Sequence, residues 1–383
     1  MSEIRLSADR IQTETIGPFG PSQIMYHLHR GTFIGDTSAG RYEMPCEIAT
    51  AVNPAQADGT CIFEPHHRFD GSVVRDFVFG RNFLFAGGAS HATVQYRRAG
   101  GVADYDILFQ FVETLRRIPH LLQRVDRIYG MGVSDSATPM QAIYPTFGHQ
   151  VFDLTFVCNT GYKKPYIPPV IASSHNPPKR IIVFGTENEF VPQLVQDVAQ
   201  NNNFPYYRFY TVSRAPHIPD TPLTRPIHTA PPRPVPIAGT TPIRWDLFLR
   251  SLLVEGHAWV TKEEPPPPSV TLKTVPGDPP RVALDPMGNA LGGIRHPAIE
   301  TGEATFLPTV LHGNWPYFGG RGNERTIEQF GSFDVYFSKF KQAVESLVAA
   351  RFLRRHDADK LLANAALNRA NTFTRSYAAG LFV

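Results

Sequence analysis

Residues 125–134, with the sequence VDRIYGMGVS, constrain the fold of this chain more than any other segment. A short apolar stretch leads to Gly130 and Gly132, and Ser134 follows, directly before a run of residues compatible with a helix. This pattern is typical of a nucleophile elbow, a sharp strand-to-helix turn that holds a serine in a strained backbone conformation. The pattern predicts that the Ser134 hydroxyl projects from the carboxyl end of a strand as the nucleophile of an acyl-transfer enzyme.

The last position of this motif departs from the usual form, which is Gly-x-Ser-x-Gly. Here Ser136 takes the place of the second glycine, and serine is small enough for that place. An ordinary strand-to-loop junction is the alternative interpretation of so short a pattern. The decision between the two depends on the rest of the chain.

The composition excludes several other classes of protein. The chain has 383 residues, 42% of them hydrophobic and 19% charged, which is typical of a globular α/β protein of one or two domains. A net charge of only +3, without a long basic block, argues against nucleic acid or an anionic membrane as the partner. The three cysteines, Cys46, Cys61 and Cys158, show no paired spacing and are expected to be buried thiols.

The first 14 residues, MSEIRLSADRIQTE, lack the basic-then-apolar order of a secretory signal, and no run approaches the length of a membrane span. These features predict a cytoplasmic enzyme. The 35 prolines gather in residues 165–178, 216–242, 265–268 and 276–286, which are expected to be ordered loops or extended connectors.

Hydrophobic periodicity predicts strands that alternate with helices along most of the chain. Strands are expected at residues 44–52, 60–64, 82–85, 127–129, 152–158, 180–184 and 206–212, and helices at 105–115, near 140–147, and at 245–262, 333–348 and 357–368. The continuous apolar runs are typical of strands buried on both faces of a parallel sheet. The pattern predicts a doubly wound α/β fold with a core over residues 1–262, a loop-rich excursion over the active site at 263–330, and C-terminal helices at 331–383.

A serine nucleophile requires a histidine base and an acid that orients the histidine, in the chain order serine, acid, histidine. The strand at 180–184 leads into a turn that contains Glu187 and Glu189, where the acid is expected. The next strand leads to His217, the only histidine that follows the acid turn at this distance. Glu189 is preferred as the acid because it lies deeper in the turn, and Glu187 remains a competitor.

Catalysis of acyl transfer also requires at least two donors for the oxyanion. The backbone N–H of Asp135 is the first candidate because it follows the nucleophile at the start of a helix. The second donor is expected after the strand at 60–64, near His67 or Arg68, although no His-Gly-Gly-Gly run is present. The pair His66 and His67 lacks a third ligand at suitable spacing, so no metal site is predicted.

Five segments together resemble the serine esterase-like α/β-hydrolase domain family of large bacterial and fungal proteins. They are TCIFEPHHR at 60–68, GMGVSDSA at 130–137, GTENEF at 185–190, SRAPHIPD at 213–220 and LDPMGNALGGIRHP at 284–297. The resemblance implies an α/β-hydrolase fold and a carboxylesterase or lactone-type hydrolase, with its triad at Ser134, the 187–189 turn and His217. This chain departs from the family at Ser136 and at the His66–His67 pair, where the usual form has a single asparagine before the arginine.

These observations predict a serine esterase that acts on a small-molecule carboxylic ester or lactone without a cofactor. Trp315, Tyr317 and Phe318 are candidate walls of the substrate pocket, and packing of the excursion onto the core is the alternative role for them. An acyltransferase with the same triad and a catalytically silent binding scaffold are the competing hypotheses. The sequence leaves the oligomeric state open, including a homo-oligomer.

Overall fold

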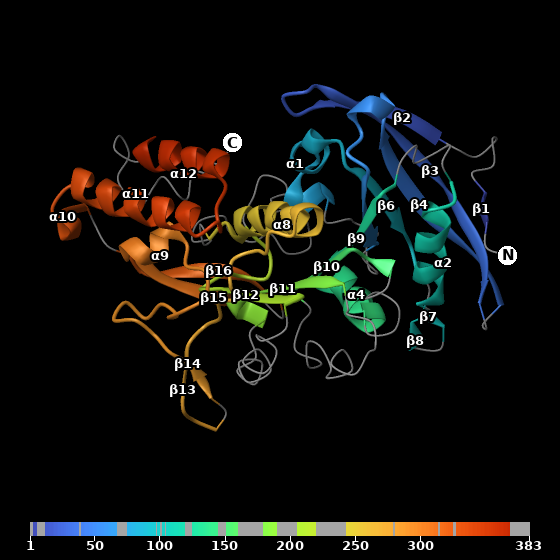
Figure 1. Ribbon diagram of the computed structural model, residues 1–383. Coiled ribbons are helices and arrows are strands. Elements are labelled where there is room, and N and C mark those ends of the chain that lie inside the picture. The colour runs from blue at the N-terminus through green and yellow to red at the C-terminus, as the bar shows by residue number, and fades with distance from the viewer. Residues whose placement is uncertain are drawn as a thin grey trace. The chain divides into compact units, whose positions relative to one another are not determined.

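The computed structural model describes residues 3–5, 12–37, 40–66, 75–96, 98–99, 102–103, 105–118, 125–144, 151–159, 179–189, 205–219, 243–278, 280–312, 315–324 and 327–367. The chain folds into two compact units. The first comprises Met1–Thr160 and Pro165–Ile182, and the second comprises Gly161–Lys164 and Val183–Val383. In Figure 1 the first unit runs from blue to green and the second from yellow-green to red.

The first unit is built on a sheet with the strand order β1-β3-β4-β6-β5-β9-β10, and β2 pairs with β3. Its strands are β1 (Glu3–Arg5), β2 (Gln12–Phe19), β3 (Ile24–Thr37), β4 (Gly40–Ala51), β5 (Thr60–Pro65), β6 (Ser90–Val94), β9 (Arg127–Val133) and β10 (Leu154–Cys158). A separate short hairpin joins β7 (Arg98–Ala99) and β8 (Val102–Ala103).

The centre of this sheet is parallel, as the apolar runs predict. Strand β5 pairs in parallel with β6 and β9, and β9 pairs in parallel with β10. Strands β5, β6 and β10 are buried along their whole length, so their side chains have no polar alternation. The stacked rings of Phe63 and Phe152, with centroids 5.8 Å apart, are part of this core. Cys46, Cys61 and Cys158 are buried, unpaired thiols.

Two helices pack on the sheet of the first unit. Helix α2 (Asp106–Leu115) buries one apolar face with Ile107, Leu108, Phe111, Val112 and Leu115. Helix α4 (Ala137–Ile143) packs against β9 and β10. The Phe111 ring meets Phe33 of β3 edge to face, with centroids 5.1 Å apart, so α2 and the antiparallel part of the sheet share one core.

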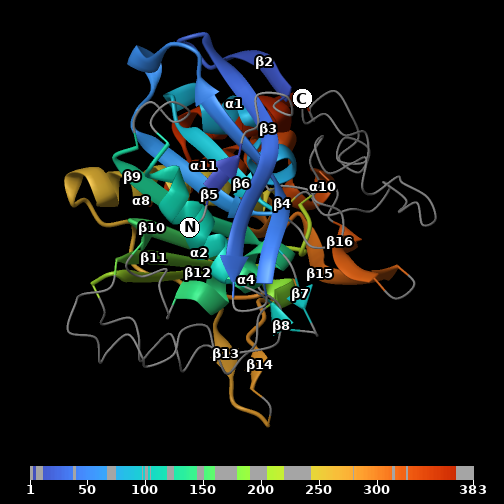
Figure 2. The same cartoon turned by 90° about the vertical axis from the view of Figure 1, so that its right-hand side faces the viewer.

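A long antiparallel extension precedes the parallel strands, and of its strands the sequence predicted only β4, as the strand at residues 44–52. Strand β3 pairs antiparallel with β1, β2 and β4, and Figure 2 shows β3 and β4 as two long neighbouring ribbons. The signal for β3 was available, because Ile24, Tyr26 and Leu28 are buried at every second position.

The strand predicted at residues 82–85 is wrong. These residues lie in α1 (Arg81–Leu84) and the start of the 3₁₀ turn η3 (Phe85–Gly87). Tertiary packing explains the helical conformation, because the Phe85 ring stacks on Tyr26 at a centroid distance of 4.3 Å and Leu84 is also buried.

The second unit contains the end of β11 (Arg180–Thr186), the neighbouring strand β12 (Tyr207–Val212) and the helix α8 (Trp245–Lys262). Helix α8 has the bounds that its periodicity predicts. Its Trp245 ring packs against Phe184 of β11 with centroids 5.8 Å apart. The chain after α8 also reaches β12, where Val270 and Ile294 form bridges with Tyr210 and Val212.

The segment predicted as a loop-rich excursion contains several regular elements. They are β13 (Thr274–Val275), β14 (Arg281–Val282), α9 (Pro297–Thr301), β15 (Ala304–His312) and β16 (Trp315–Glu324). Strands β15 and β16 form an antiparallel pair with register shifts between Ala304 and Phe306 and again beyond Leu307. These shifts interrupt the two-residue alternation, so the sequence does not reveal the strands. The role of this segment over an active site stays a prediction.

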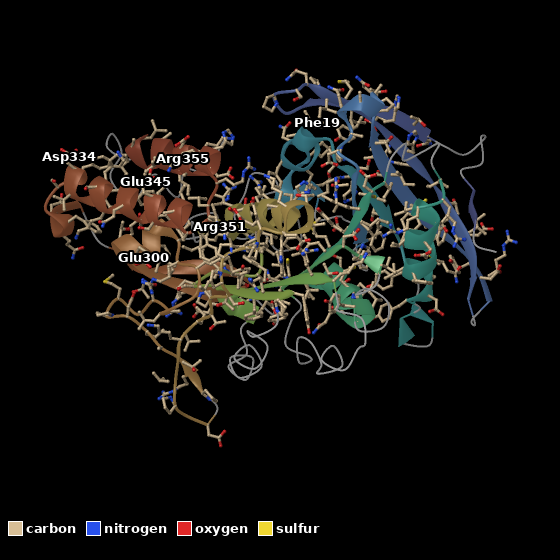
Figure 3. All side chains as sticks on the ribbon, in the orientation of Figure 1. Phe19, Glu300, Asp334, Glu345, Arg351 and Arg355 are labelled. Atoms are coloured by element: carbon tan, nitrogen blue, oxygen red, sulfur yellow. The ribbon has the colours of Figure 1, made fainter. Side chains whose placement is uncertain are left out.

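The chain continues into α10 (Ile327–Phe330), α11 (Phe333–Ala349) and α12 (Arg355–Leu367). The Ser332 side chain caps α11 by accepting a hydrogen bond from Val335 N. A bidentate ion pair joins Arg355 to Glu345, with N–O distances of 2.7 and 2.6 Å (Figure 3). The predicted α/β class is confirmed, with a parallel central sheet and flanking helices.

Candidate active site

Ser134 stands at the junction between β9 and the following helix. Strand β9 ends at Val133, residues Ser134–Ser136 form the 3₁₀ turn η4, and α4 begins at Ala137. Ser134 has a φ of 57°, in the left-handed region that side chains other than glycine rarely adopt. A strand, a strained serine and a helix in direct succession are the geometry of a nucleophile elbow.

The two glycines before Ser134 are required by close packing. A Cβ atom on Gly132 would lie 2.3 Å from the carbonyl oxygen of Ser136, which is backbone and cannot yield. A Cβ atom on Gly130 would lie 2.5 Å from the Met140 side chain and 2.9 Å from Phe152. Gly132 therefore permits the turn itself, whereas Gly130 permits the close approach of Met140 in α4 and of Phe152 to β9.

The serine that replaces the usual second glycine supports the turn. The Ser136 hydroxyl is fully buried, accepts a hydrogen bond from Val133 N at 2.9 Å and donates to Val133 O at 3.0 Å. These two bonds close the turn around Ser134. The departure from the motif is thus compatible with the elbow, and the Ser136 side chain adds two hydrogen bonds that glycine would not provide.

The predicted oxyanion donors are described only in part. Asp135 lies in η4 directly after Ser134, as predicted. His67 and Arg68 lie outside the described residues. His66 is described, and its backbone N–H donates to Val94 O at 3.1 Å, which continues the pairing of β5 with β6. Among the residues that the structure describes, no group of three His, Cys, Asp or Glu side chains could hold a metal ion.

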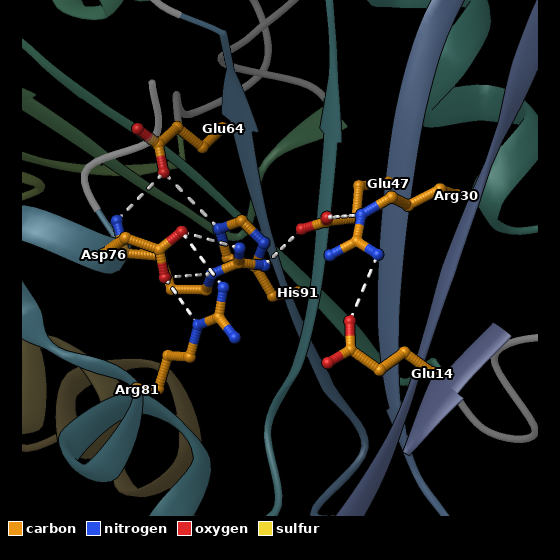
Figure 4. A network of polar contacts seen from close by, with 8 residues as sticks. Glu14, Arg30, Glu47, Glu64, Asp76, Arg81 and His91 are labelled. Atoms are coloured by element: carbon orange, nitrogen blue, oxygen red, sulfur yellow. Dashed lines mark hydrogen bonds and ion pairs between the residues drawn. The ribbon is translucent and has the colours of Figure 1, made fainter. Parts of the chain in front are cut away.

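A network of charged side chains anchors the chain on both sides of the predicted oxyanion segment (Figure 4). Glu64, which is fully buried near the end of β5, accepts a hydrogen bond from Arg75 N at 3.4 Å, and its Oε2 lies 3.4 Å from His91 Nε2. Burial, together with the charge of Arg75, holds the pKa of His91 well below its ordinary value, so the imidazole is neutral. Glu64 therefore joins the end of β5 to the start of the π-helical turn η2 (Arg75–Phe79).

The same network extends from Arg75 to the surface. The Arg75 guanidinium is buried between Glu47, at 2.7 Å, and Asp76, at 2.9 Å. Glu47 also binds Arg30 at 3.0 Å, and Arg30 binds Glu14 at 3.2 Å. Sequence reasoning missed this network because its members come from β2, β3, β4, β5, β6 and η2, and no local spacing links them.

The predicted acid and base lie together in the second unit. Strand β11 leads into the 3₁₀ turn η7 (Glu187–Glu189), called the acid turn below. Strand β12 leads into residues 213–217, called the histidine loop below. Oε1 of Glu189 lies 2.6 Å from Nδ1 of His217, and the two side chains are 3% and 11% exposed. Such a short, buried contact is typical of a charge-assisted hydrogen bond.

The other candidate acid, Glu187, has a different partner. Its Oε2 accepts a hydrogen bond from Arg214 N at 2.7 Å, and its Oε1 accepts one from Arg214 Nη1 at 3.0 Å. Burial raises the pKa of Glu187, and the nearby Arg214 and Arg295 oppose that shift. In this structure Glu189, and not Glu187, is the carboxylate that contacts the histidine.

Sequence reasoning also missed Arg214, which has a φ of 53° and is buried. The sequence signal that could have indicated Arg214 is a cation three residues before the histidine in a chain whose acid turn carries two carboxylates. The remaining predicted site residues, Trp315, Tyr317 and Phe318, lie in β16, and their side chains are outside what the structure describes. Ser134 belongs to the first unit, whereas Glu189 and His217 belong to the second.

Comparison with known proteins identifies the family. Residues 90–363 match the family described as alpha/beta hydrolase domain. This chain belongs to that family. The match includes the elbow, the acid turn, the histidine loop and the segment at 284–297, whereas β5 and η2 lie before it. Membership places the chain among hydrolases.

Several solved structures of esterases and of another hydrolase are similar to this alpha/beta hydrolase at low sequence identity. A structure of fungal esterases from Rhizomucor miehei has a TM-score of 0.37 and 9% identity, and the match covers 48% of this chain and 74% of the other. An S-formylglutathione hydrolase from Staphylococcus aureus has a TM-score of 0.34 and 10% identity, with 48% and 91% covered. An arylesterase has a TM-score of 0.34 and 14% identity, with 48% and 75% covered.

A search of curated proteins returned no match for this alpha/beta hydrolase. None of the helices in the described part of the chain is long and apolar enough to cross a membrane.

Proposed function

We propose that this alpha/beta hydrolase is a serine esterase that cleaves a carboxylic ester or lactone through an acyl-enzyme on Ser134. The observation that carries the proposal is the left-handed backbone of Ser134 between a buried strand and a helix. Strain at a residue other than glycine persists only where the surroundings enforce it, and such residues cluster at active sites. Gly132 and Ser136 provide that enforcement here.

The proposed mechanism assigns one role to each group. His217 takes the proton of the Ser134 hydroxyl as the oxygen attacks the acyl carbon, and it later activates the water that releases the acid product. Glu189 holds the imidazole with its proton on Nδ1, which the 2.6 Å contact supports. The backbone N–H of Asp135 stabilises the oxyanion, with a second donor from the segment near His67 and Arg68. No step requires a cofactor.

The test is labelling with a fluorophosphonate probe, followed by peptide mapping, together with hydrolysis of p-nitrophenyl acetate. We expect the wild type to be labelled on Ser134, and Ser134→Ala and His217→Ala to lose both labelling and turnover. Ser346→Ala is the control, because Ser346 is an exposed serine whose hydroxyl donates to Gln342 O within α11. Full esterase activity in Ser134→Ala would overturn the proposal.

The same assay separates the two competing functions. An acyltransferase would be labelled equally but would transfer the acyl group to an added alcohol in preference to water at low alcohol concentration. A silent binding scaffold would leave Ser134 unlabelled although the protein is folded.

A further inference from the structure

The acid turn and the histidine loop are joined at three successive positions of the acid turn. Glu187 binds Arg214, Asn188 N donates to Ala215 O at 3.3 Å, and Glu189 binds His217. The contact that orients the histidine is therefore the last of three. The first contact, between Glu187 and Arg214, is the most extensive, because one carboxylate binds both the backbone and the side chain of the same residue.

Arg214 requires this support for two reasons. Its φ of 53° is costly for a residue with a side chain, by about 1 kcal/mol or more. Its side chain is only 10% exposed, so an unpaired charge there would be strongly unfavourable. Glu187 compensates both costs, because one carboxylate oxygen fixes the backbone N–H and the other neutralises the guanidinium.

The second anchor of Arg214 comes from the segment at 284–297, which the proposed chemistry leaves without a role. Nη2 of Arg214 donates to the carbonyl oxygen of Gly288. Gly288 has a φ of 79° and lies in a turn closed by Asp285, whose Oδ1 accepts hydrogen bonds from Met287 N and Asn289 N, both at 2.9 Å. The other oxygen of Asp285 binds Arg295 at 2.7 Å, which fixes the two ends of the segment to each other.

The same segment holds the start of the histidine loop directly. The Ser213 hydroxyl donates to Ala290 O at 2.9 Å, and Ser213 N donates to Ile294 O at 3.0 Å. The Asn289 side chain in turn donates to Ala304 O and accepts from Phe306 N, both at 2.8 Å, so the segment is tied to β15. Residues 213 and 214 are thus held between the acid turn and a rigid support.

We propose that the Glu187–Arg214 pair, anchored on the Gly288 carbonyl, is a positioning device that sets the orientation of the His217 imidazole toward Glu189. Glu187 and Arg214 are positioning residues, and the 284–297 segment is their support. The expected effect on kcat rests on the proposed function. The expected effect on the His217–Glu189 hydrogen bond does not depend on Ser134.

The test compares Glu187→Gln and Arg214→Lys with a matched control, Asp246→Asn. Glutamine keeps the shape of Glu187 and removes its charge, and lysine keeps the charge of Arg214 without the planar fork that reaches two acceptors. Asp246 is also a buried carboxylate of the second unit, and both its oxygens bind Arg244 at 2.8 Å, but it makes no contact with the acid turn or the histidine loop among the described interactions.

Three measurements are made on each variant: kcat and KM for p-nitrophenyl acetate, the melting temperature, and the downfield proton NMR signal of His217 Nδ1–H. We expect Glu187→Gln to lower kcat about 10- to 100-fold with KM nearly unchanged, since a small misplacement of a catalytic group has effects of this size. The Nδ1–H signal shifts or disappears. Arg214→Lys shows the same changes to a smaller extent, and Asp246→Asn loses thermal stability with kcat and the NMR signal retained.

Two outcomes would overturn the inference. One is a kcat within twofold of wild type in Glu187→Gln together with an unchanged Nδ1–H signal. The other is an equal loss of kcat in Asp246→Asn, which would indicate general loosening. A wild type that shows neither labelling nor turnover would refute the proposed function instead, and the NMR signal would still decide the positioning role.

Discussion

The carboxylate of Glu189 and the imidazole of His217 are joined through Nδ1, at 2.6 Å, in a largely buried environment. A glutamine at position 189 could donate its amide hydrogens to Nδ1 and would stabilise the wrong tautomer. We therefore expect Glu189→Gln to lower kcat by about 10⁴-fold with a small effect on KM. Steady-state kinetics with p-nitrophenyl acetate measures this, and a variant that keeps more than a tenth of wild-type kcat would remove Glu189 from the proposed triad.

The elbow predicts different outcomes for two glycine substitutions. Gly132→Ala would place a methyl group 2.3 Å from a backbone oxygen, so we expect loss of fluorophosphonate labelling. Gly87→Ala is the control, because a methyl group there meets nothing within 4 Å. Normal labelling of Gly132→Ala would show that the turn can relax and that the glycine is not required.

The buried Ser136 hydroxyl predicts a stability effect. Ser136→Ala removes both hydrogen bonds between the buried hydroxyl and Val133, and we expect a loss of about 1–3 kcal/mol in the free energy of unfolding. Ser136→Gly restores the usual motif and removes the same bonds, so it is expected to lose a similar amount. Urea denaturation measures both, and a neutral Ser136→Ala would contradict the role of this hydroxyl.

The charged network described above includes Arg75 and Arg30, which have similar partners and different burial. Arg75 is 1% exposed and Arg30 is 44% exposed. Removal of a buried partner leaves uncompensated charges, so Arg75→Met is expected to cost about 3–5 kcal/mol of stability. Arg30→Met is expected to cost about 0–1 kcal/mol, because exposed ion pairs contribute little. Equal effects in the two variants would contradict the assigned burial.

The buried His296 side chain is expected to make the free energy of unfolding depend on pH. Burial lowers its pKa to about 3. Between that value and the unfolded value near 6.5, the unfolded chain binds more protons than the folded chain, so stability falls as the pH falls through this window, by up to about 1.4 kcal/mol per pH unit.

The check is the free energy of unfolding between pH 7 and pH 4 in His296→Asn. Asparagine does not titrate and can replace the Nδ1 acceptor that caps α9. We expect a smaller slope in this variant than in the wild type. A wild-type slope in His296→Asn would show that other groups dominate.

The parts of the fold with a local signal were predictable from the sequence. Helix α8 shows this, because its apolar spacing gave both of its ends, and so does β10, which is a continuous apolar run. The 82–85 segment was misread because its helical form depends on contact with Tyr26, which is remote in sequence. The antiparallel strand β15 was missed because bulges remove its alternation.

Prediction of the candidate site from the sequence is limited in the same way, because contacts between remote elements leave no local signal. The positions of Ser134, Glu189 and His217 after the ends of β9, β11 and β12 were predictable, because each follows an apolar run along the chain. The choice between the two glutamates was only a preference, because both lie in one turn. In the structure Glu187 binds Arg214, which leaves Glu189 as the carboxylate that contacts His217. The contacts of Arg214, like those of Glu64, join elements that are remote in sequence, and no spacing along the chain encodes them.

Under the proposed function, the backbone of Ser134 implies a conflict between thermostability and activity. Glycine adopts a φ of 57° without the steric penalty that a side chain incurs, so Ser134→Gly is expected to raise the free energy of unfolding by about 1 kcal/mol. A laboratory selection for heat resistance alone would thus favour loss of the serine. Any programme to stabilise this enzyme therefore needs an activity screen in parallel, with position 134 kept fixed.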